Sequence, residues 1–104
     1  MKNNFCLFGG NQKDNIKNKI EKFVNEYVDF NKVADYSEER LVQSILNSYY
    51  RMISNPNNED LDRLIINLRD KKSLVSGYLL ITREDKVYKL AFYDFVHRNE
   101  IVLG

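Results

Sequence analysis

The spacing of hydrophobic residues divides the chain into a helical part and a strand-forming part. From residue 14 to about residue 72, apolar side chains recur every three or four positions, which is the period of an amphipathic helix. From residue 74 to residue 93, β-branched and aromatic residues fill two short runs on either side of four charged residues. A run of helices followed by strands is typical of the α+β class, and we expect the helices to pack on the sheet.

The stretch 74–93 predicts an antiparallel β-hairpin with strands at 74–82 and 87–93. The first strand is apolar on both faces, which predicts either cover on both sides or a partner strand on its second edge. Gly77 within it indicates a bulge or a close approach of backbone. The tip, Arg83 to Lys86, is fully charged, so we expect it to be solvated. It contains neither Asn-Gly nor Asp-Gly, and its turn type stays open.

Three amphipathic helices are predicted before the hairpin. The first covers 14–30, and the second runs from about Ser37 to Ser54 with Asp35 or Ser37 as its N-cap. Pro56 and the asparagines around it then break the chain. The third helix is expected from about residue 58 to residue 72, with acids in its first turn and bases in its last. Its apolar stripe is Leu61, Leu64, Ile65 and Leu68, and Ile66 lies off that stripe.

The two ends of the chain leave alternatives open. Residues 5–8 fit either a short N-terminal strand at the sheet edge or a tail that docks into the core. Residues 94–104 fit either a short third strand after a turn at Arg98 and Asn99, which we favour, or a helical turn near Asp94. The predicted fold is therefore α+β, a single compact domain (1–104). Three amphipathic helices pack on a small antiparallel sheet that is formed mainly by the C-terminal hairpin, with the N-terminal strand as an optional addition.

Composition and charge exclude several classes of protein. The net charge is +1, and no segment carries the basic excess that binding to phosphates usually requires. The single cysteine, Cys6, cannot form an internal disulfide, which indicates a reducing compartment. No apolar run is long enough for a signal peptide or a membrane span. We therefore expect a cytoplasmic protein that does not bind membranes. Its frequent Asn and Lys and its lack of Trp are typical of AT-rich bacterial or phage genomes.

Candidate catalytic and metal-binding residues are few. Cys6 and His97 are the only thiol and the only imidazole, and a Cys–His pair is one arrangement for nucleophilic catalysis. Cys6 lies in an apolar run, however, where a buried and inert cysteine is the usual finding. Asp94, His97 and Glu100 recur every three residues, but a transition metal usually requires more imidazole or thiolate ligands. Because the sequence also has no phosphate-binding loop or nucleophile elbow, we predict no catalytic residues, no metal site and no cofactor.

The second predicted helix carries the best candidate for a protein-binding site. Tyr49 falls on its apolar stripe, whereas Tyr50 falls at the edge of that stripe beside Arg51. Exposed Tyr and Arg are enriched among the residues that dominate binding energy at interfaces. With the neighbouring polar positions, the predicted partner-binding residues are Tyr50, Arg51, Asn47 and Arg40.

A nucleic-acid site is the alternative. Aromatic residues of the hairpin strands stand near lysines, an arrangement that proteins use to bind single-stranded RNA. The candidate residues are Tyr78, Tyr88, Lys86 and Lys89 on the sheet, together with the lysines of the first helix. The acids Glu84, Asp85 and Asp94 cancel part of the charge, and no RNP-type motif is present. Packing of these rings under the helices therefore competes with RNA binding as their explanation.

Together these observations predict a small non-enzymatic protein that binds another protein and modulates or inhibits it. The size and the residue usage fit a protein of a phage or mobile element, such as an anti-defence or anti-CRISPR inhibitor or an immunity protein. The alternative is the nucleic-acid-binding module just described. A homodimer also fits, because Ile66 and the doubly apolar strand have no assigned contacts, and an uncovered apolar patch often marks an interface.

Overall fold

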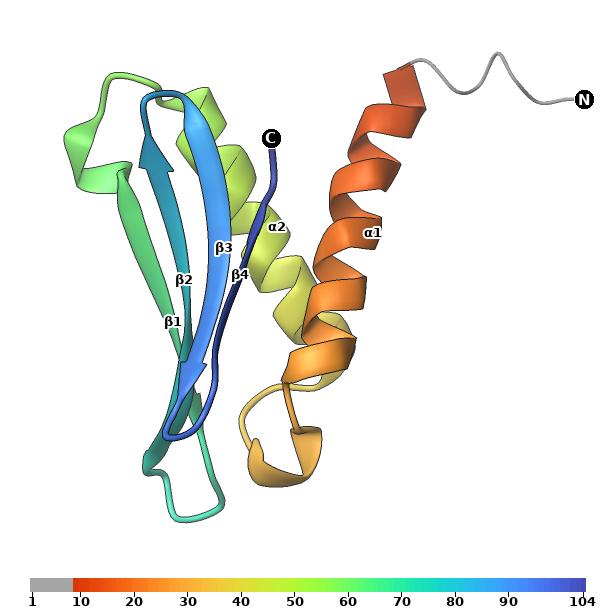
Figure 1. Cartoon of the computed structure of the whole chain (residues 1–104), viewed down its shortest axis with the longest axis vertical. Helices are drawn as coiled ribbons and strands as arrows, with labels where there is room; N and C mark the ends of the chain where they lie inside the picture. Colours follow the sequence, from red (N-terminus) through yellow and green to blue (C-terminus); the bar gives the residue numbers. More distant parts are fainter. Residues whose placement is uncertain (1–8) are drawn as a thin grey trace, which may run out of the picture.

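Two helices pack against one face of a four-stranded antiparallel sheet (Figure 1). The computed structural model describes the backbone of residues 9–104 and the side chains of residues 15–104. The helices are α1 (Gly9–Tyr27) and α2 (Glu38–Ser54), and the strands, in spatial order, are β1 (Arg63–Arg69), β2 (Val75–Glu84), β3 (Val87–Asp94) and β4 (Arg98–Val102). Two 3-10 turns, η2 (Phe30–Lys32) and η3 (Glu59–Leu61), lie in the connections. The predicted α+β class and the hairpin of β2 and β3 are confirmed.

The predicted third helix is wrong, because residues 58–72 form η3 and β1 instead. In β1, Leu64, Ile66 and Leu68 alternate onto the face that packs against the helices, so Ile66 belongs to the core in a strand although it is off the stripe of a helix. The apolar spacing of this segment fits both periods. The strand is favoured because β2 has backbone N–H and C=O groups on the edge that does not face β3. Only an extended chain can pair with those groups. The first hairpin strand is therefore an inner strand with a partner on each edge, which was one of the two expected alternatives.

The other predicted elements differ mainly at their boundaries. The second predicted helix is α2, and Ser37 is its N-cap, with the side chain accepting from the backbone N–H of Arg40 (3.2 Å). The favoured C-terminal strand is β4, although the turn before it is formed by residues 95–97 rather than by Arg98 and Asn99. The N-terminal strand predicted at residues 5–8 lies outside the described part of the chain.

The core lies between the helix layer and the inner face of the sheet. Each element supplies side chains at its own period, 3.6 residues for the helices and two for the strands. The fully buried residues include Ile20, Val24, Leu41, Ile45, Met52, Leu68, Leu79, Ile81, Leu90 and Leu103. Burying one such side chain contributes about 1.5–3 kcal/mol, and this packing holds the sheet with its other face directed outward.

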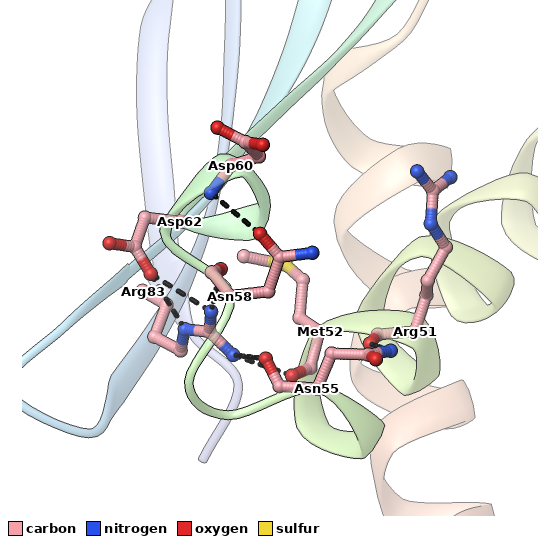
Figure 2. A network of polar contacts seen from close by, with 7 residues as sticks. All are labelled: Arg51, Met52, Asn55, Asn58, Asp60, Asp62 and Arg83. Carbon is pink, nitrogen blue, oxygen red and sulfur yellow. Dashed lines mark hydrogen bonds and ion pairs between the residues drawn. The ribbon is translucent and has the colours of Figure 1, made fainter.

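Arg83 joins the hairpin to the end of α2 (Figure 2). Its guanidinium donates to the carboxylate of Asp62 (2.9 Å) and to the backbone carbonyls of Met52, Asn55 (3.1 Å) and Asn58 (2.9 Å). The side chain is only 7% exposed, so the prediction that Arg83 is solvated is wrong. The carbonyls at the end of a helix lack partners within the helix, and a buried arginine can donate to several of them at once.

Two backbone features shape the hairpin. Asp85 and Lys86 at its tip have φ values of 51° and 66°, and positive φ at both central residues identifies a type I′ turn. Gly77 in β2 has ordinary φ, but a Cβ at this position would lie 2.9 Å from the carbonyl oxygen of Tyr93. The predicted close approach of backbone at Gly77 is therefore present. The bulge lies beside it, where the register between β1 and β2 shifts at Leu68 and Arg69.

Candidate binding surfaces

The face of the sheet directed away from α1 and α2 is covered by no helix or strand of the described chain (Figure 1). We call it the open face. Its register places side chains in three rows that cross all four strands. The rows are Arg63, Thr82, Lys89 and Val102; then Ile65, Leu80, Ala91 and Glu100; then Asn67, Tyr78, Tyr93 and Arg98. Ile65 is 55% exposed and Val102 is 52% exposed, so apolar area reaches solvent at both edges of this face.

Tyr78, Tyr93 and Arg98 stand side by side in the third row. The ring centroids of Tyr78 and Tyr93 lie 5.1 Å apart, with 22° between the ring planes. The guanidinium carbon of Arg98 lies over the Tyr93 ring, 5.5 Å from its centroid. Because β2 and β4 flank β3 on opposite sides, Tyr78 and Arg98 cover opposite faces of the Tyr93 ring. The row therefore presents ring edges and hydroxyl groups to a partner.

Exposed apolar side chains gather at the end of the sheet opposite the hairpin tip. The loop between β1 and β2 and the turn between β3 and β4 both lie at this end (Figure 1). We call it the apolar end, and its members are Leu74, Val75, Phe95 and Val96. Phe95 is 92% exposed and Val96 is 83% exposed. The pairing of Gly77 with Asp94 brings the start of β2 next to the end of β3, so the exposed apolar residues of both loops lie at the same end of the sheet.

An aspartate organises each loop of the apolar end. One carboxylate oxygen of Asp94 accepts from the backbone N–H groups of Val96 (2.8 Å) and His97. One carboxylate oxygen of Asp70 accepts in the same way from Lys72 (2.8 Å) and Leu74 (3.1 Å). Such bonds satisfy turn backbone without secondary structure. They also hold exposed apolar side chains in one arrangement, which lowers the entropy lost when a partner binds.

The charge of the open face is more basic than that of the whole chain. Its three rows hold Arg63, Lys89 and Arg98 against Glu100, and Glu84, which alternates with Thr82 onto the same face of β2, adds a second acid beside the hairpin tip. The Nζ atom of Lys89 lies 3.9 Å from a carboxylate oxygen of Glu100, a long and exposed ion pair. A pair of this kind contributes little to stability, at most about 1 kcal/mol. Arg63 and Arg98 make no ion pair with the side chains of residues 15–104, so both can meet an acidic partner.

The predicted site on α2 forms a polar stripe on the other side of the molecule. Arg40, Asn47 and Arg51 are exposed and follow one another at helical spacing, and Gln43 between them donates to Asn47 (3.0 Å). Tyr50, which we expected at the edge of the apolar stripe beside Arg51, is half-buried and packs against the core. The structure therefore brings three of the four predicted residues together, but around little exposed apolar area.

The predicted nucleic-acid residues do not form one surface. Tyr78 lies on the open face, whereas Tyr88 faces the helices, where its ring meets that of Tyr49 edge-on at 5.3 Å. Lys89 lies on the open face, and Lys86 lies in the turn at the hairpin tip. The lysines of α1 are on the far side of the sheet, so they cannot extend an aromatic surface on the open face.

The residues considered for catalysis and metal binding do not converge. Cys6 lies outside the described residues. The Nδ1 atom of His97 lies 3.1 Å from a carboxylate oxygen of Asp94 beside the turn, whereas Glu100 lies next to Lys89. Among residues with described side chains, no group of three or more His, Cys, Asp and Glu is placed to hold a metal ion.

We compared the chain with protein-family models, curated proteins and solved structures, and none of them matches it. In the described part of the chain, no helix is both long and apolar enough to cross a membrane.

The residues of this surface that we did not predict from the sequence are Phe95, Val96 and Arg98. One signal was available, since an apolar pair inside a segment that is otherwise polar has no obvious place in a core.

Proposed function

We propose that this chain is a small non-enzymatic protein-binding domain, and that its partner contacts the apolar end and the adjoining part of the open face. The observation that carries the proposal is the group of four exposed apolar side chains beside the row of Tyr78, Tyr93 and Arg98. Contiguous apolar area on a single domain marks an interaction site, and Tyr and Arg are frequent where binding energy is concentrated. A domain that acts by binding to another protein fits the role of an inhibitor or an immunity protein.

The partner's chemistry follows from the charges around this surface. Arg98 lies within it, and Arg63 and Lys89 lie farther along the same face, where Glu100 and Glu84 oppose them. We expect a partner that sets apolar side chains over Phe95 and Val96 and carboxylates beside Arg98. Complementary charge of this kind speeds association and orients the two proteins, while burial of the apolar centre supplies most of the affinity.

A protein partner explains the surface better than single-stranded RNA does. RNA-binding sheets stack bases on exposed ring faces. Here Tyr78 and Arg98 already occupy both faces of the Tyr93 ring, so a base would have to displace one of them. The apolar end adds Leu74, Val75 and Val96, aliphatic side chains that offer neither a ring on which a base can stack nor a charge for a phosphate.

Two matched charge reversals test the site. Arg98→Glu alters the open face, and Arg51→Glu makes the same change in an exposed arginine on α2, which was the site expected from sequence. We expect immobilised Arg98→Glu protein to capture at least about tenfold less partner from nuclease-treated lysate of the source cells, a loss of ~1.4 kcal/mol. Arg51→Glu should capture as much as the unaltered chain.

A second variant tests the apolar end separately. Phe95→Ala removes a side chain that is 92% exposed, so it should not alter the fold, which the circular dichroism spectrum can check. We expect the same loss of capture as with Arg98→Glu. Loss caused only by Arg51→Glu would move the site to α2, and capture that depends on nucleic acid would overturn the proposal in favour of a nucleic-acid-binding module.

A further inference from the structure

The outer edge of β1 has free backbone over its middle. The carbonyl of Asp62 accepts from the backbone N–H of Arg83 (2.9 Å), so position 62 is bonded toward β2. Bonding direction alternates along an antiparallel ladder, so residues 64, 66 and 68 also turn toward β2 while residues 63, 65 and 67 turn outward. No described residue bonds the outward N–H or C=O groups of Arg63, Ile65 or Asn67.

The far end of the same edge is occupied by the connection between η2 and α2. At Arg69, the next outward position, the backbone N–H donates to the carboxylate of Asp35 (3.0 Å), and the carbonyl accepts from the backbone N–H of Ala34 (2.7 Å). These contacts close the edge at Arg69 and leave residues 63–67 open. Natural proteins usually protect such an edge with a charge, a proline or a bulge, and this stretch has none of these at its centre, where Ile65 is 55% exposed.

We propose that β1 pairs antiparallel with β1 of a second copy of this chain, about a two-fold axis at Ile65. The two four-stranded sheets then form one continuous sheet. Ile65 faces its own symmetry mate, Arg63 faces Asn67 of the second copy, and each of these pairs exchanges two backbone hydrogen bonds. A two-fold contact closes on itself, so the assembly stops at a dimer.

Charge disfavours a shift of the axis toward Ile66, and it disfavours pairing through the opposite edge of the sheet. Moving the axis by one residue, to Ile66, would set Arg63 opposite Arg69 of the second copy. Pairing through the β4 edge about its central residue would set Glu100 opposite itself. Like charges directly opposite are destabilising, whereas the pairing at Ile65 joins two apolar side chains and meets no like charge.

This inference does not depend on the proposed function. A two-fold axis perpendicular to the sheet keeps the helices of both copies on one side and both open faces on the other. Neither the apolar end nor Arg98 takes part in the contact. Failure of the dimer would therefore leave the protein-binding surface intact, and failure of partner capture would leave the dimer intact.

Disulfide trapping tests the register. In a Cys6→Ser background, Ile65→Cys places two thiols at a backbone-bonded antiparallel pair, where the Cα atoms lie about 5.5 Å apart and a disulfide can close. Val102→Cys is the matched control, because Val102 is similarly exposed (52%) and lies on the opposite edge strand. We expect rapid, nearly complete dimer formation for Ile65→Cys under mild oxidation and at least about tenfold slower formation for Val102→Cys. Equal rates would overturn the proposal.

Sedimentation equilibrium tests the same contact without a covalent bond. We expect the full chain to dimerise reversibly, and Ile65→Lys, which sets two lysines against each other, to weaken dimerisation at least about tenfold. Val102→Lys should leave it unchanged. A chain that stays monomeric up to ~1 mM would overturn the proposal.

Discussion

The guanidinium of Arg83 and the carboxylate of Asp62 lie 2.9 Å apart at the point where the chain leaves η3 and enters β1. The backbone N–H of Arg83 also donates to the carbonyl of Asp62 (2.9 Å). Main chain and side chain thus join the same two residues, which sets the register of β1 on β2. The Tyr88 side chain and, to a lesser degree, the Asp62 carboxylate raise the pKa of Arg83, with burial opposing them. The arginine therefore stays charged wherever the protein is folded.

Replacing Arg83 by alanine should lower the melting temperature by about 5–10 °C, because the carbonyls of Met52 and Asn55 at the end of α2 lose a charged donor. Arg83→Lys should recover only part of the loss, since an ammonium lacks the planar fork that reaches Asp62 and Asn58 together. Thermal unfolding followed by circular dichroism measures both variants. Arg63→Ala, an exposed arginine in the adjoining strand, should change little. Equal effects of Arg63→Ala and Arg83→Ala would contradict the assigned role.

Gly77→Ala should lower the free energy of unfolding by about 1–3 kcal/mol. The added Cβ would lie 2.9 Å from the carbonyl oxygen of Tyr93 and 3.3 Å from Cε1 of Phe92, so β2 and β3 would have to separate locally. Urea denaturation measures the change. Gly104→Ala is the control, since its Cβ would meet no backbone atom but only the outer end of a side chain, the Tyr49 hydroxyl at 3.3 Å. An unchanged midpoint for Gly77→Ala would show that this approach is not tight.

Lys86→Gly should raise the free energy of unfolding by about 0.5 kcal/mol, because Lys86 has a φ of 66° and glycine adopts this conformation without a steric penalty. Urea denaturation can resolve this gain if the slope of the transition is unchanged. Glu84→Gly, in β2 just before the turn, should have the opposite sign, since glycine weakens a strand. Destabilisation by Lys86→Gly would contradict the type I′ turn.

Asp94 should make the turn between β3 and β4 sensitive to acid. Burial acts to raise the pKa of Asp94, but bonds from the backbone N–H groups of Val96 and His97, and from the His97 side chain, outweigh it and hold the pKa below the usual 3.8. The unfolded chain therefore takes up this proton at higher pH than the folded chain, and stability falls as pH drops below about 5. Asp94→Asn should lose less stability than the unaltered chain between about pH 5 and pH 3, measured by urea denaturation. Identical pH profiles would exclude the linkage.

Single-stranded RNA should not bind the third row of the open face. In a titration with oligouridine followed by ¹H–¹⁵N spectra, we expect no saturable shift at Tyr78 or Tyr93, because both faces of the Tyr93 ring and one face of the Tyr78 ring are occupied. Any weak shifts should instead appear at surface lysines and vanish with added salt. Saturable shifts at both tyrosines would favour nucleic-acid binding over the protein-binding function that we propose.

Part of the fold can be predicted from local sequence. The period of the apolar residues predicted α1, α2 and the hairpin, because each buries a single stripe or face whose spacing is visible in the chain. Ser37 was predictable as one of the candidate N-caps, since it satisfies an orphan N–H three residues away. The charged run at residues 83–86 marked the turn, but it did not reveal that Arg83 bends back, because the carbonyls it meets are up to 31 residues away.

The remaining features depended on tertiary structure. The segment around Ile65 and Ile66 has an apolar spacing that fits a helix or a strand, and only the unsatisfied edge of β2 makes the strand the better choice. The binding surface is likewise a product of pairing, since Tyr78, Tyr93 and Arg98 come from three strands and meet only through the register of the sheet. The sequence by itself determined which residues are apolar and at what period they recur. The packing of the two helices on one face decided which of them remain exposed on the other, because burial belongs to the assembled layers and not to any one segment.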